Sequence, residues 1–295
     1  MLSLLARRSV PAAGGVRCFA KAASIPTKYN VLTIPALRDN FTYIISNMKS
    51  NNALIVDPTN PKFCDDAVKS CKFNLKAITI THHHRKHILG LGELLKSYSE
   101  VPVYGGEYED SNHEVEKVLK DGDSVELDDI AFKVISAPCH TPDSLIYEFT
   151  EESGFPFLMT GDTICLGGVG YIPQENASML YSLIYDKLMN YPEETCIFHG
   201  HENGEEMLRF AMSIEPTNAD AKNLRWGIKH TLLKSRSKPA TPTCLHDEKL
   251  VNPFFRVNEP TVKEALGESD PKKAFEELLR RRNAYFAKKA RKGWF

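Results

Sequence analysis

The segment from residue 80 to residue 88 constrains the chemistry of this chain more than any other. Four histidines fall within six residues, in the order His82, His83, His84, Arg85, Lys86 and His87. They follow the β-branched run 77–81, which predicts a strand. In extended backbone the imidazoles of His82 and His84 project to the same side, as two ligands of one metal ion require. A histidine cluster can also be a polar surface loop, and the tract alone leaves both interpretations open.

Strand and helix patterns alternate up to residue 201. Strand patterns occur at 29–35, 41–46, 53–56, 77–81, 101–104, 130–136, 145–149, 157–160 and 196–198. Helical spacing occurs at 61–73, 88–98 and 177–190. This alternation predicts a layered α/β architecture. Beyond residue 201 strand patterns almost vanish, and helical spacing at 204–214, 219–234 and 272–289 predicts a C-terminal α-helical domain.

Three later residues favour a metal site over a surface loop. His140, Asp162 and His201 each follow the end of a predicted strand, where α/β enzymes usually assemble their sites. Neutral imidazole suits zinc and iron, and a carboxylate oxygen can complete or bridge such a site. We therefore expect these side chains to join the clustered histidines.

Five short motifs carry a resemblance to a known family. They are Ile-Thr-His-His-His at 80–84, Cys-His-Thr at 139–141, Gly-Asp-Thr at 161–163, Gly-His-Glu at 200–202 and Asn-Pro-Phe-Phe-Arg-Val at 252–257. With them the chain resembles glyoxalase II, the hydroxyacylglutathione hydrolase family of the metallo-β-lactamase superfamily. The resemblance implies an αββα sandwich at 25–201 and a C-terminal α-helical domain at 202–295. It also implies hydrolysis of the thioester S-D-lactoylglutathione to D-lactate and glutathione.

The resemblance implies two metal positions that share an aspartate. The first-site ligands of the family correspond here to His82, His84, His140 and Asp162. The second site of the family uses the bridging aspartate, two histidines and an aspartate just before the last clustered histidine. Its histidines correspond to His87 and His201, but Lys86 stands in place of that aspartate.

Lys86 predicts a degenerate second site. A protonated ammonium cannot donate an electron pair, and it repels a cation about 4 Å away by on the order of 4 kcal/mol at an effective dielectric near 20. We therefore expect one firmly bound ion, zinc or alternatively iron. Two other interpretations stay open: Lys86 swings outward and three ligands hold a weak second ion, or Lys86 acts as a catalytic base after burial removes its proton.

The residues that bind glutathione in the family are also altered. A lysine and a tyrosine of the loop after the Gly-Asp-Thr motif align with Gly170 and Ile172, which leaves Tyr171 as a candidate substitute. A second tyrosine aligns with Asn203. Near the C-terminus an arginine is retained as Arg280, and a lysine three residues later becomes Asn283. Each lost charge-assisted contact costs on the order of 1.5–3 kcal/mol, so we expect a small-molecule thioester other than a glutathione thioester, or no substrate.

The N-terminal residues 1–19 have the composition of a mitochondrial transit peptide. They contain Arg7, Arg8 and Arg17 and no acid, and the first acidic residue of the chain is Asp39. This predicts import into the mitochondrial matrix, and the alternative is a disordered basic tail. Seven cysteines without a Cys-x-x-Cys pair fit a reducing compartment.

The charge balance and the apolar runs limit the partners. Without the three N-terminal arginines the chain has 34 basic and 38 acidic residues, so we expect no general binding of nucleic acid. No apolar run approaches the roughly 20 residues of a membrane span. The basic stretch 272–292 is most simply a solvated helix face, although it could dock an acidic partner, anionic lipid or RNA. Two functions therefore remain: a hydrolase, or a catalytically inactive structural subunit of a mitochondrial protein assembly.

Overall fold

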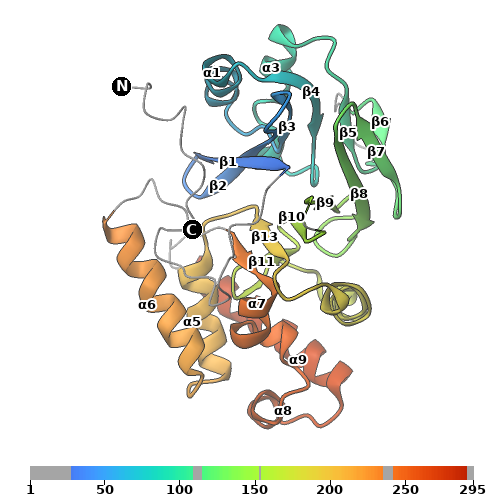
Figure 1. Cartoon of the computed structure of the whole chain (residues 1–295). Coiled ribbons are helices and arrows are strands. Elements are labelled where there is room, and N and C mark those ends of the chain that lie inside the picture. Colours follow the sequence, from blue (N-terminus) through green and yellow to red (C-terminus); the bar gives the residue numbers. More distant parts are fainter. Residues whose placement is uncertain (1–27, 109–114, 153, 235–241, 291–295) are drawn as a thin grey trace.

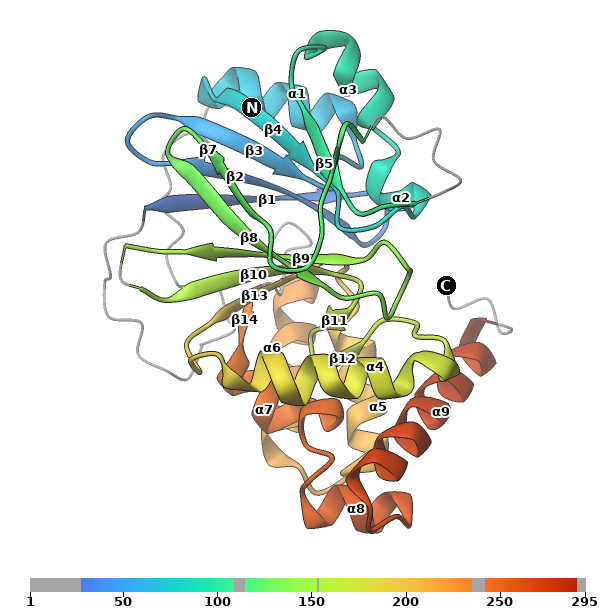
Figure 2. The same ribbon diagram turned by 90° about the vertical axis from the view of Figure 1, so that its right-hand side faces the viewer.

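The structure, a computed structural model, describes residues 28–108, 115–152, 154–234 and 242–290. The predicted transit peptide lies outside these residues. Two six-stranded sheets face each other, and helices cover the outer face of each sheet (Figure 1, Figure 2). The predicted αββα sandwich and the helical C-terminal part are thus confirmed.

The first sheet follows the order of the chain. Its strands are β1 (Tyr29–Ala36), β2 (Asn40–Asn47), β3 (Asn52–Val56), β4 (Asn74–Thr79), β5 (Val103–Gly105) and β6 (Lys117–Val118). β1 to β3 are antiparallel, whereas β3 to β6 run parallel. On the outer face Ile44, Ile55 and Ile78 pack against α1 (Pro61–Cys71) and α3 (Leu91–Ser97). Because β3 is covered on both faces, its sequence is a continuous apolar run rather than an alternating one.

The second sheet has the order β14-β13-β10-β9-β8-β7. Its strands are β7 (Ser124–Leu127), β8 (Ile130–Ser136), β9 (Leu145–Thr150), β10 (Pro156–Gly161), β13 (Cys196–His199) and β14 (Thr243–Cys244). Only β10 and β13 pair in parallel among these strands. Between the sheets Phe132, Tyr147 and Phe149 form one apolar layer with Tyr43 and Leu54 of the first sheet.

The outer face of the second sheet carries the hairpin β11 (Ile164–Cys165) and β12 (Gly168–Val169), and the remaining helices. The helices are α4 (Ala177–Ser182), α5 (Gly204–Ile214), α6 (Ala219–Lys234), α7 (Leu245–Val251), α8 (Pro260–Leu266) and α9 (Pro271–Ala290). Ile146 and Ile197 of the sheet share an apolar core with Leu180 of α4 and Phe275 of α9. None of the helices in the described ranges is long and apolar enough to cross a membrane.

Two local expectations differ from the structure. The helix predicted at 88–98 is divided into α2 (Arg85–Ile88) and α3 at Gly90. A Cβ on Gly90 would lie 2.7 Å from the carbonyl oxygen of Pro58, so the chain turns there to pass a neighbouring loop. Thr243 and Cys244 extend the second sheet as β14, although the sequence shows almost no strand pattern beyond residue 201. A two-residue strand is defined by its partner β13 and leaves almost no pattern of its own.

Glu248 ties the helical part to the β11–β12 hairpin. Its fully buried carboxyl group accepts hydrogen bonds from the backbone N–H of Gly167 at 3.0 Å, from Asn252 Nδ2 at 2.8 Å and from Thr243 Oγ1 at 3.0 Å. Burial raises the pKa of Glu248 to about 8, although these hydrogen bonds oppose the shift. Gly167 lies in the turn of the hairpin, so Glu248 supports the segment that leads to Tyr171.

Glu248 is expected to make the stability of the protein depend on pH. Its folded pKa of about 8 exceeds the ordinary value of 4.5, so the folded state binds the proton more tightly. The stabilisation is complete below about pH 4.5 and is lost as the pH rises through 8, by up to about 1.4 kcal/mol per pH unit. Glu248→Gln should flatten this slope in urea unfolding between pH 5 and 9. The exposed Glu264→Gln is the control, and an unchanged slope in Glu248→Gln would show that Glu248 does not titrate there.

Candidate metal centre

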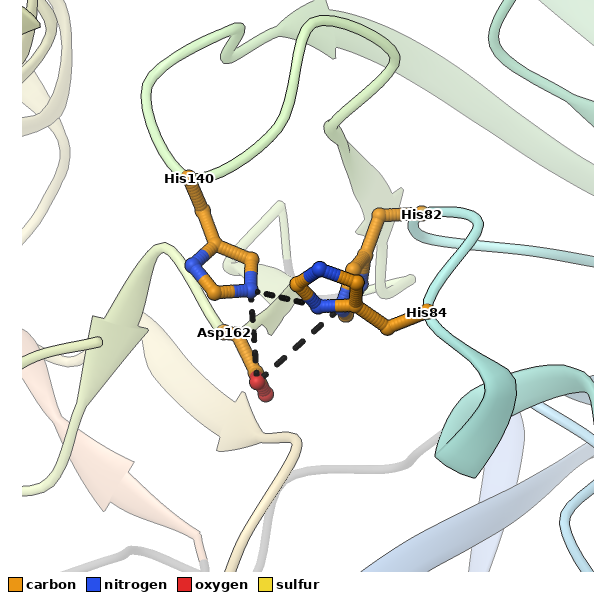
Figure 3. Close-up of side chains that lie close together, drawn as sticks. All are labelled: His82, His84, His140 and Asp162. Carbon is orange, nitrogen blue, oxygen red and sulfur yellow. Dashed lines mark hydrogen bonds and ion pairs between the residues drawn. The ribbon is translucent and has the colours of Figure 1, made fainter. Parts of the chain in front are cut away.

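The first group of predicted ligands converges at one edge of the sandwich. His82 and His84 follow β4, His140 lies between β8 and β9, and Asp162 follows β10. Nδ1 of His84 lies 3.1 Å from Nε2 of His82 and 3.0 Å from Nε2 of His140. Oδ2 of Asp162 lies 3.6 Å from Nε2 of His140 and 3.9 Å from Nε2 of His82. Figure 3 shows the four side chains pointing toward one another.

This geometry fits a divalent metal ion. In a tetrahedral site with bonds of about 2.0–2.1 Å, ligand atoms stand roughly 3.3 Å apart, close to the spacing seen here. Neutral imidazole nitrogens that face one another repel through their lone pairs, and one cation between them satisfies all of them. His140 Nδ1 donates a hydrogen bond to the carbonyl oxygen of Tyr171 at 2.5 Å, which leaves Nε2 free as a ligand. Oδ1 of Asp162 is buried and accepts no hydrogen bond from any described residue.

A second group of potential ligands adjoins the first and shares Asp162. Nε2 of His87 lies 3.2 Å from Nε2 of His201 and 3.4 Å from Oδ1 of Asp162. Nε2 of His201 lies 3.2 Å from Oδ2 of Asp162. These three side chains again face a common point. The structure therefore brings together all six side chains that the resemblance implies as ligands.

Two buried or half-buried carboxylates orient the histidines of the second group. Oδ2 of Asp57 lies 2.8 Å from Nδ1 of His87, and Asp57 also accepts hydrogen bonds from the backbone and the hydroxyl group of Thr81. Oδ1 of Asp39 lies 3.2 Å from Nδ1 of His201. A carboxylate on Nδ1 fixes the tautomer that offers Nε2 to a metal. Asp57 and Asp39 thus support the site without being ligands.

Asp57→Asn is expected to lower the free energy of unfolding by about 1.5–3 kcal/mol, because it removes a charged acceptor from His87 and Thr81. Asn keeps the size of the side chain and tolerates the φ of 54° at this position. The measurement is urea unfolding with metal chelated. Asp66→Asn is the control, because Asp66 forms a surface ion pair with Lys62 that contributes little. Equal losses in both variants would contradict the role of Asp57.

The first-group histidines are neutral near pH 7. Burial, together with the neighbouring histidines, lowers the pKa of His84 to about 4. Burial also lowers the pKa of His82 and of His140, in spite of the Asp162 carboxylate. Each ring therefore has a lone pair available without the loss of a proton, which favours metal binding.

The two histidines of the second group have raised pKa values, in contrast to the histidines of the first group. Burial lowers the pKa of His87, but the carboxylates of Asp162 and Asp57 outweigh it and raise the pKa to about 10. In the same way Asp162 and Asp39 raise the pKa of His201 to about 9. Burial raises the pKa of Asp162, yet positive charge on the two histidines holds it well below its usual range. A cation that binds here must displace protons, so its affinity rises with pH.

Comparison with known proteins connects this geometry to a family. Residues 42–201 match the metallo-beta-lactamase superfamily, and residues 202–285 match the C-terminus of hydroxyacylglutathione hydrolase. A hydroxyacylglutathione hydrolase of Aliivibrio fischeri (strain MJ11) is 34% identical over 237 residues, which cover 80% of this chain and 90% of that protein. The chain belongs to the hydroxyacylglutathione hydrolase family. This is the glyoxalase II family that the sequence motifs indicate.

Two solved structures share the fold. ETHE1 from Myxococcus xanthus matches with a TM-score of 0.57 and 21% identity, over 85% of this chain and 89% of that one. TTHA1623, in a di-iron-bound form, matches with a TM-score of 0.51 and 18% identity, over 76% of this chain and 99% of that one. At these identities the likeness concerns the fold alone.

Lys86, which stands at the aspartate position of the glyoxalase II family, lies on α2 beside the second group. Its carbonyl oxygen accepts hydrogen bonds from Thr59 Oγ1 at 2.8 Å and from Asn40 Nδ2 at 3.5 Å. The side chains of Lys86 and Arg85 are exposed. The positive charge of Lys86 still acts electrostatically on the site, since it adds to the effect of His201 in lowering the pKa of Asp39. Exposure removes the desolvation on which a base role for Lys86 depends.

The loop after the Gly-Asp-Thr motif presents Tyr171 to solvent. A Cβ on Gly170 would overlap the carbonyl oxygen of Asp162, so no side chain fits at position 170 with this backbone. The expectation that Gly170 replaces a substrate-binding lysine is therefore wrong for this loop. Tyr171 is 59% exposed, and its carbonyl oxygen accepts the hydrogen bond of His140. It is the side chain of this loop that can contact a substrate.

The other altered positions take part in internal contacts or lie apart from the histidines. Asn283 Nδ2 donates to the carbonyl oxygen of Ile172 at 2.8 Å. Asn203 Nδ2 lies 3.6 Å from Cys165 Sγ, while its Oδ1 is buried without a partner in the described chain. Arg280 is exposed, forms two hydrogen bonds with Glu277 and borders a groove between α5 and α9. The structure does not bring Arg280 to the two metal groups.

Three residues near the site were not singled out from the sequence. Asp57 directly follows β3, just as Asp162 directly follows β10, and this shared position could have marked Asp57 as a residue of the site. Asp39 lies in the turn between β1 and β2, where no pattern marks it. Arg282 is one cation in the basic stretch 272–292, and only the structure shows that it is the buried one among the described cations of that stretch.

Proposed function

We propose that this chain is a metal-dependent thioester hydrolase with one firmly bound ion and a substrate other than a glutathione thioester. The observation that carries the proposal is the convergence of four ligand atoms from His82, His84, His140 and Asp162 at separations of 3.0–3.9 Å. Membership of the hydroxyacylglutathione hydrolase family supports the thioester as the bond that is cleaved.

The residues of the chain bind and orient the reacting groups. His82, His84 and His140 are neutral and can hold a divalent ion together with the charged Asp162. When bound, such an ion supplies Lewis acidity, which lowers the pKa of water and polarises a carbonyl group. The carbonyl oxygen of Tyr171 keeps His140 in the tautomer that binds metal, and the side chain of Tyr171 is exposed.

Zinc is the metal that we propose for the first position, with iron as the alternative. Three imidazoles and one carboxylate suit either ion. The second position has three ligands in place, but Lys86 supplies a positive charge where the family supplies a carboxylate. We propose that this position binds metal weakly, and that the nearby carboxylates of Asp39 and Asp57 offset only part of the repulsion.

The proposed change of substrate rests on the positions that contact glutathione in the family. Asn203 and Asn283 lack the phenol and the ammonium that the family places there, and Asn283 is engaged by the carbonyl oxygen of Ile172. Arg280 pairs with Glu277. We therefore propose that the thioester carries a thiol other than glutathione.

Metal analysis combined with a panel of thioesters tests the proposal. We expect about one zinc or iron per chain and faster turnover of acyl thioesters of small thiols or coenzyme A than of S-D-lactoylglutathione. His140→Ala should lose both metal and turnover. Two firmly bound ions with S-D-lactoylglutathione as the best substrate would overturn the proposed divergence, and a metal-free protein would overturn the hydrolase proposal.

A second candidate function is that of a catalytically inactive subunit in a mitochondrial protein assembly. It is favoured by the groove between α5 and α9, in which Phe210 and Ile214 lie beside the cations Arg280, Lys288 and Lys289. Because Phe210 and Ile214 are almost completely buried, the accessible character of the groove is basic, and it fits an acidic segment of another protein. Elution with a large assembly, absence of turnover with the whole panel, and release by Lys288→Glu would favour this function.

The mitochondrial matrix is the location that we propose, on the composition of residues 1–19. Import into isolated mitochondria, with removal of about 19 residues, is the expected result. A chain that lacks residues 1–19 should stay outside, whereas import of the shortened chain would contradict the proposed transit peptide.

A further inference from the structure

Cys196 and Cys244 lie opposite each other on neighbouring strands of the second sheet. β14 is the terminal strand of this sheet and pairs antiparallel with β13 (Figure 2). In the register of these two strands Cys196 faces Cys244 directly. Both residues are thiols in the structure. Among the cysteines of the described ranges, they are the two that strand pairing places opposite each other.

The backbone hydrogen bonds show which kind of opposed pair this is. The backbone N–H of Leu245 donates to the carbonyl oxygen of Thr195 at 2.9 Å, so these two residues form a hydrogen-bonded pair. Hydrogen-bonded and non-hydrogen-bonded pairs alternate along antiparallel strands, which makes the next pair, Cys196 and Cys244, a non-hydrogen-bonded one. In such a pair the Cα atoms lie about 4.5 Å apart, within the range of about 4.4–6.8 Å that a disulfide spans. The backbone therefore already has the spacing that a cross-link requires.

The side chains of the two cysteines lie on the same face of the sheet. Cys196 packs against the apolar layer between the two sheets, whereas its neighbour Ile197 belongs to the core shared with the helices. On the helical side Thr243 Oγ1 donates to Glu248 Oε1 at 3.0 Å. Since successive side chains of a strand point to opposite faces, Cys244 points to the inner face, as Cys196 does.

The surroundings of the two sulfur atoms differ in a way that suits a two-step reaction. Cys196 is half-buried, whereas Cys244 is completely buried. Cys244 Sγ donates a hydrogen bond to Asp247 Oδ2 at 3.2 Å. Burial raises the pKa of Asp247, although the hydrogen bond from Cys244 opposes the shift, and this makes the carboxylate a better proton acceptor. A reagent in solvent can reach Cys196, and Cys244 can release its proton to Asp247.

We propose that Cys196 and Cys244 form a reversible disulfide bond by exchange with a small-molecule disulfide such as oxidised glutathione. The Cys196 thiolate attacks one sulfur of oxidised glutathione, which breaks that S–S bond and releases one glutathione thiolate. Cys244, as its proton passes to Asp247, then attacks the sulfur of Cys196 and releases the second glutathione thiolate. The protein loses two electrons and two protons, and these convert one oxidised glutathione into two glutathione molecules. In a reducing compartment such a bond is transient and follows the redox state.

The disulfide would fix the edge of the second sheet without disturbing the metal ligands. β14 leads directly into α7, and Glu248 of α7 holds the backbone of Gly167. The cross-link closes a loop of about 50 residues, which restricts the unfolded chain and so favours the folded one. His201 follows β13, but the spacing of the strands is already suitable, so we expect it to keep its position. The modification is independent of the hydrolase function and should leave metal content unchanged.

Mass spectrometry and thermal unfolding of the full chain, before and after treatment with oxidised glutathione, test the proposal. We expect a loss of about 2 Da and a rise of the thermal midpoint by about 4–10 °C. Digestion without reduction should yield a linked pair of peptides that contain Cys196 and Cys244. Dithiothreitol should reverse the change of mass and the shift of the midpoint. Metal content is measured in parallel and should be equal in both states.

Three single substitutions distinguish the roles of the cysteines. Cys196→Ser should lose both the cross-link and the shift of the thermal midpoint. Cys244→Ser should stop at the mixed disulfide, with one glutathione on Cys196. Cys71→Ser is the control, because Cys71 is a half-buried cysteine on α1 and should leave the cross-link and the shift as in the wild-type protein.

Four results would overturn the proposal. The first is a wild-type protein that keeps both thiols, or keeps glutathione on Cys196, after treatment with oxidised glutathione. The second is a disulfide that joins other cysteines. The third is a cross-link between Cys196 and Cys244 that leaves the thermal midpoint unchanged or lowers it. The fourth is a loss of metal on oxidation, which would show that the bond distorts the sheet beside His201.

Discussion

Asp162→Ala is expected to lower metal affinity by more than about 100-fold and to abolish hydrolysis. Loss of a residue that merely supports a ligand costs about 10–100-fold, and Asp162 faces both groups of histidines directly. Without its charge, His87 and His201 also lose the anion that raises the pKa of each. The measurement is metal content after dialysis against a weak chelator, with turnover in parallel.

The control for this substitution is Asp143→Ala. Asp143 is a buried carboxylate of the same region, but it pairs with Nδ1 of His83 at 2.6 Å and belongs to neither group. The Asp143→Ala variant should keep its metal. Asp162→Asn retains a neutral oxygen, and its metal content should lie between those of Asp162→Ala and Asp143→Ala. Full metal content in Asp162→Ala would contradict the proposed centre, provided that the variant unfolds cooperatively.

Lys86→Asp is expected to raise the metal content from about one ion per chain toward two. The substitution supplies the missing carboxylate and removes a positive charge beside the second group. At about 4 Å and an effective dielectric near 20, the repulsion of a cation by one such charge is on the order of 4 kcal/mol, or roughly three orders of magnitude in affinity, and the exposed Lys86 side chain contributes less than this. Because the Lys86 side chain is exposed, the repulsion is screened and the observed gain should be smaller at high salt. Metal titration followed by elemental analysis measures the effect.

Two variants separate the charge of Lys86 from the missing ligand. Lys86→Met removes the charge without adding a donor, and it should raise the affinity of the second position only in part. Arg85→Asp makes the same change of charge at the adjacent exposed residue and should leave occupancy near one. If Arg85→Asp acts as strongly as Lys86→Asp, the effect is one of net charge, and the position of the aspartate has no special importance.

The sequence indicates the candidate ligands because most of them follow a strand. β4 and β10 end at the same edge of the sandwich, so His82, His84 and Asp162 meet there once the sheets stack. The supporting contacts depend instead on packing between distant elements. Asp57 and His87 are 30 residues apart, and Arg282 and Val169 are 113 apart. No local pattern records such a contact, and for that reason Arg282 could not be distinguished from Arg280.

Secondary structure could likewise be predicted only where the signal is local. β2 and β3 are long enough for their burial to show in the sequence, whereas β11, β12 and β14 are strands of two residues, defined only by the strands they pair with. Gly90 divides the helix predicted at 88–98 because Pro58 passes close to it. Local propensity therefore predicted the layers, and the close approach of remote segments determined the details of the site.

Anomalous diffraction at the zinc and iron edges, from crystals of protein with equimolar metal, shows directly how many metal positions are filled. We expect one strong peak among the ligand atoms of His82, His84, His140 and Asp162, and at most a weak peak beside His87 and His201. Two equally strong peaks would contradict the role of Lys86. The absence of a peak at the first position would contradict the metal centre itself.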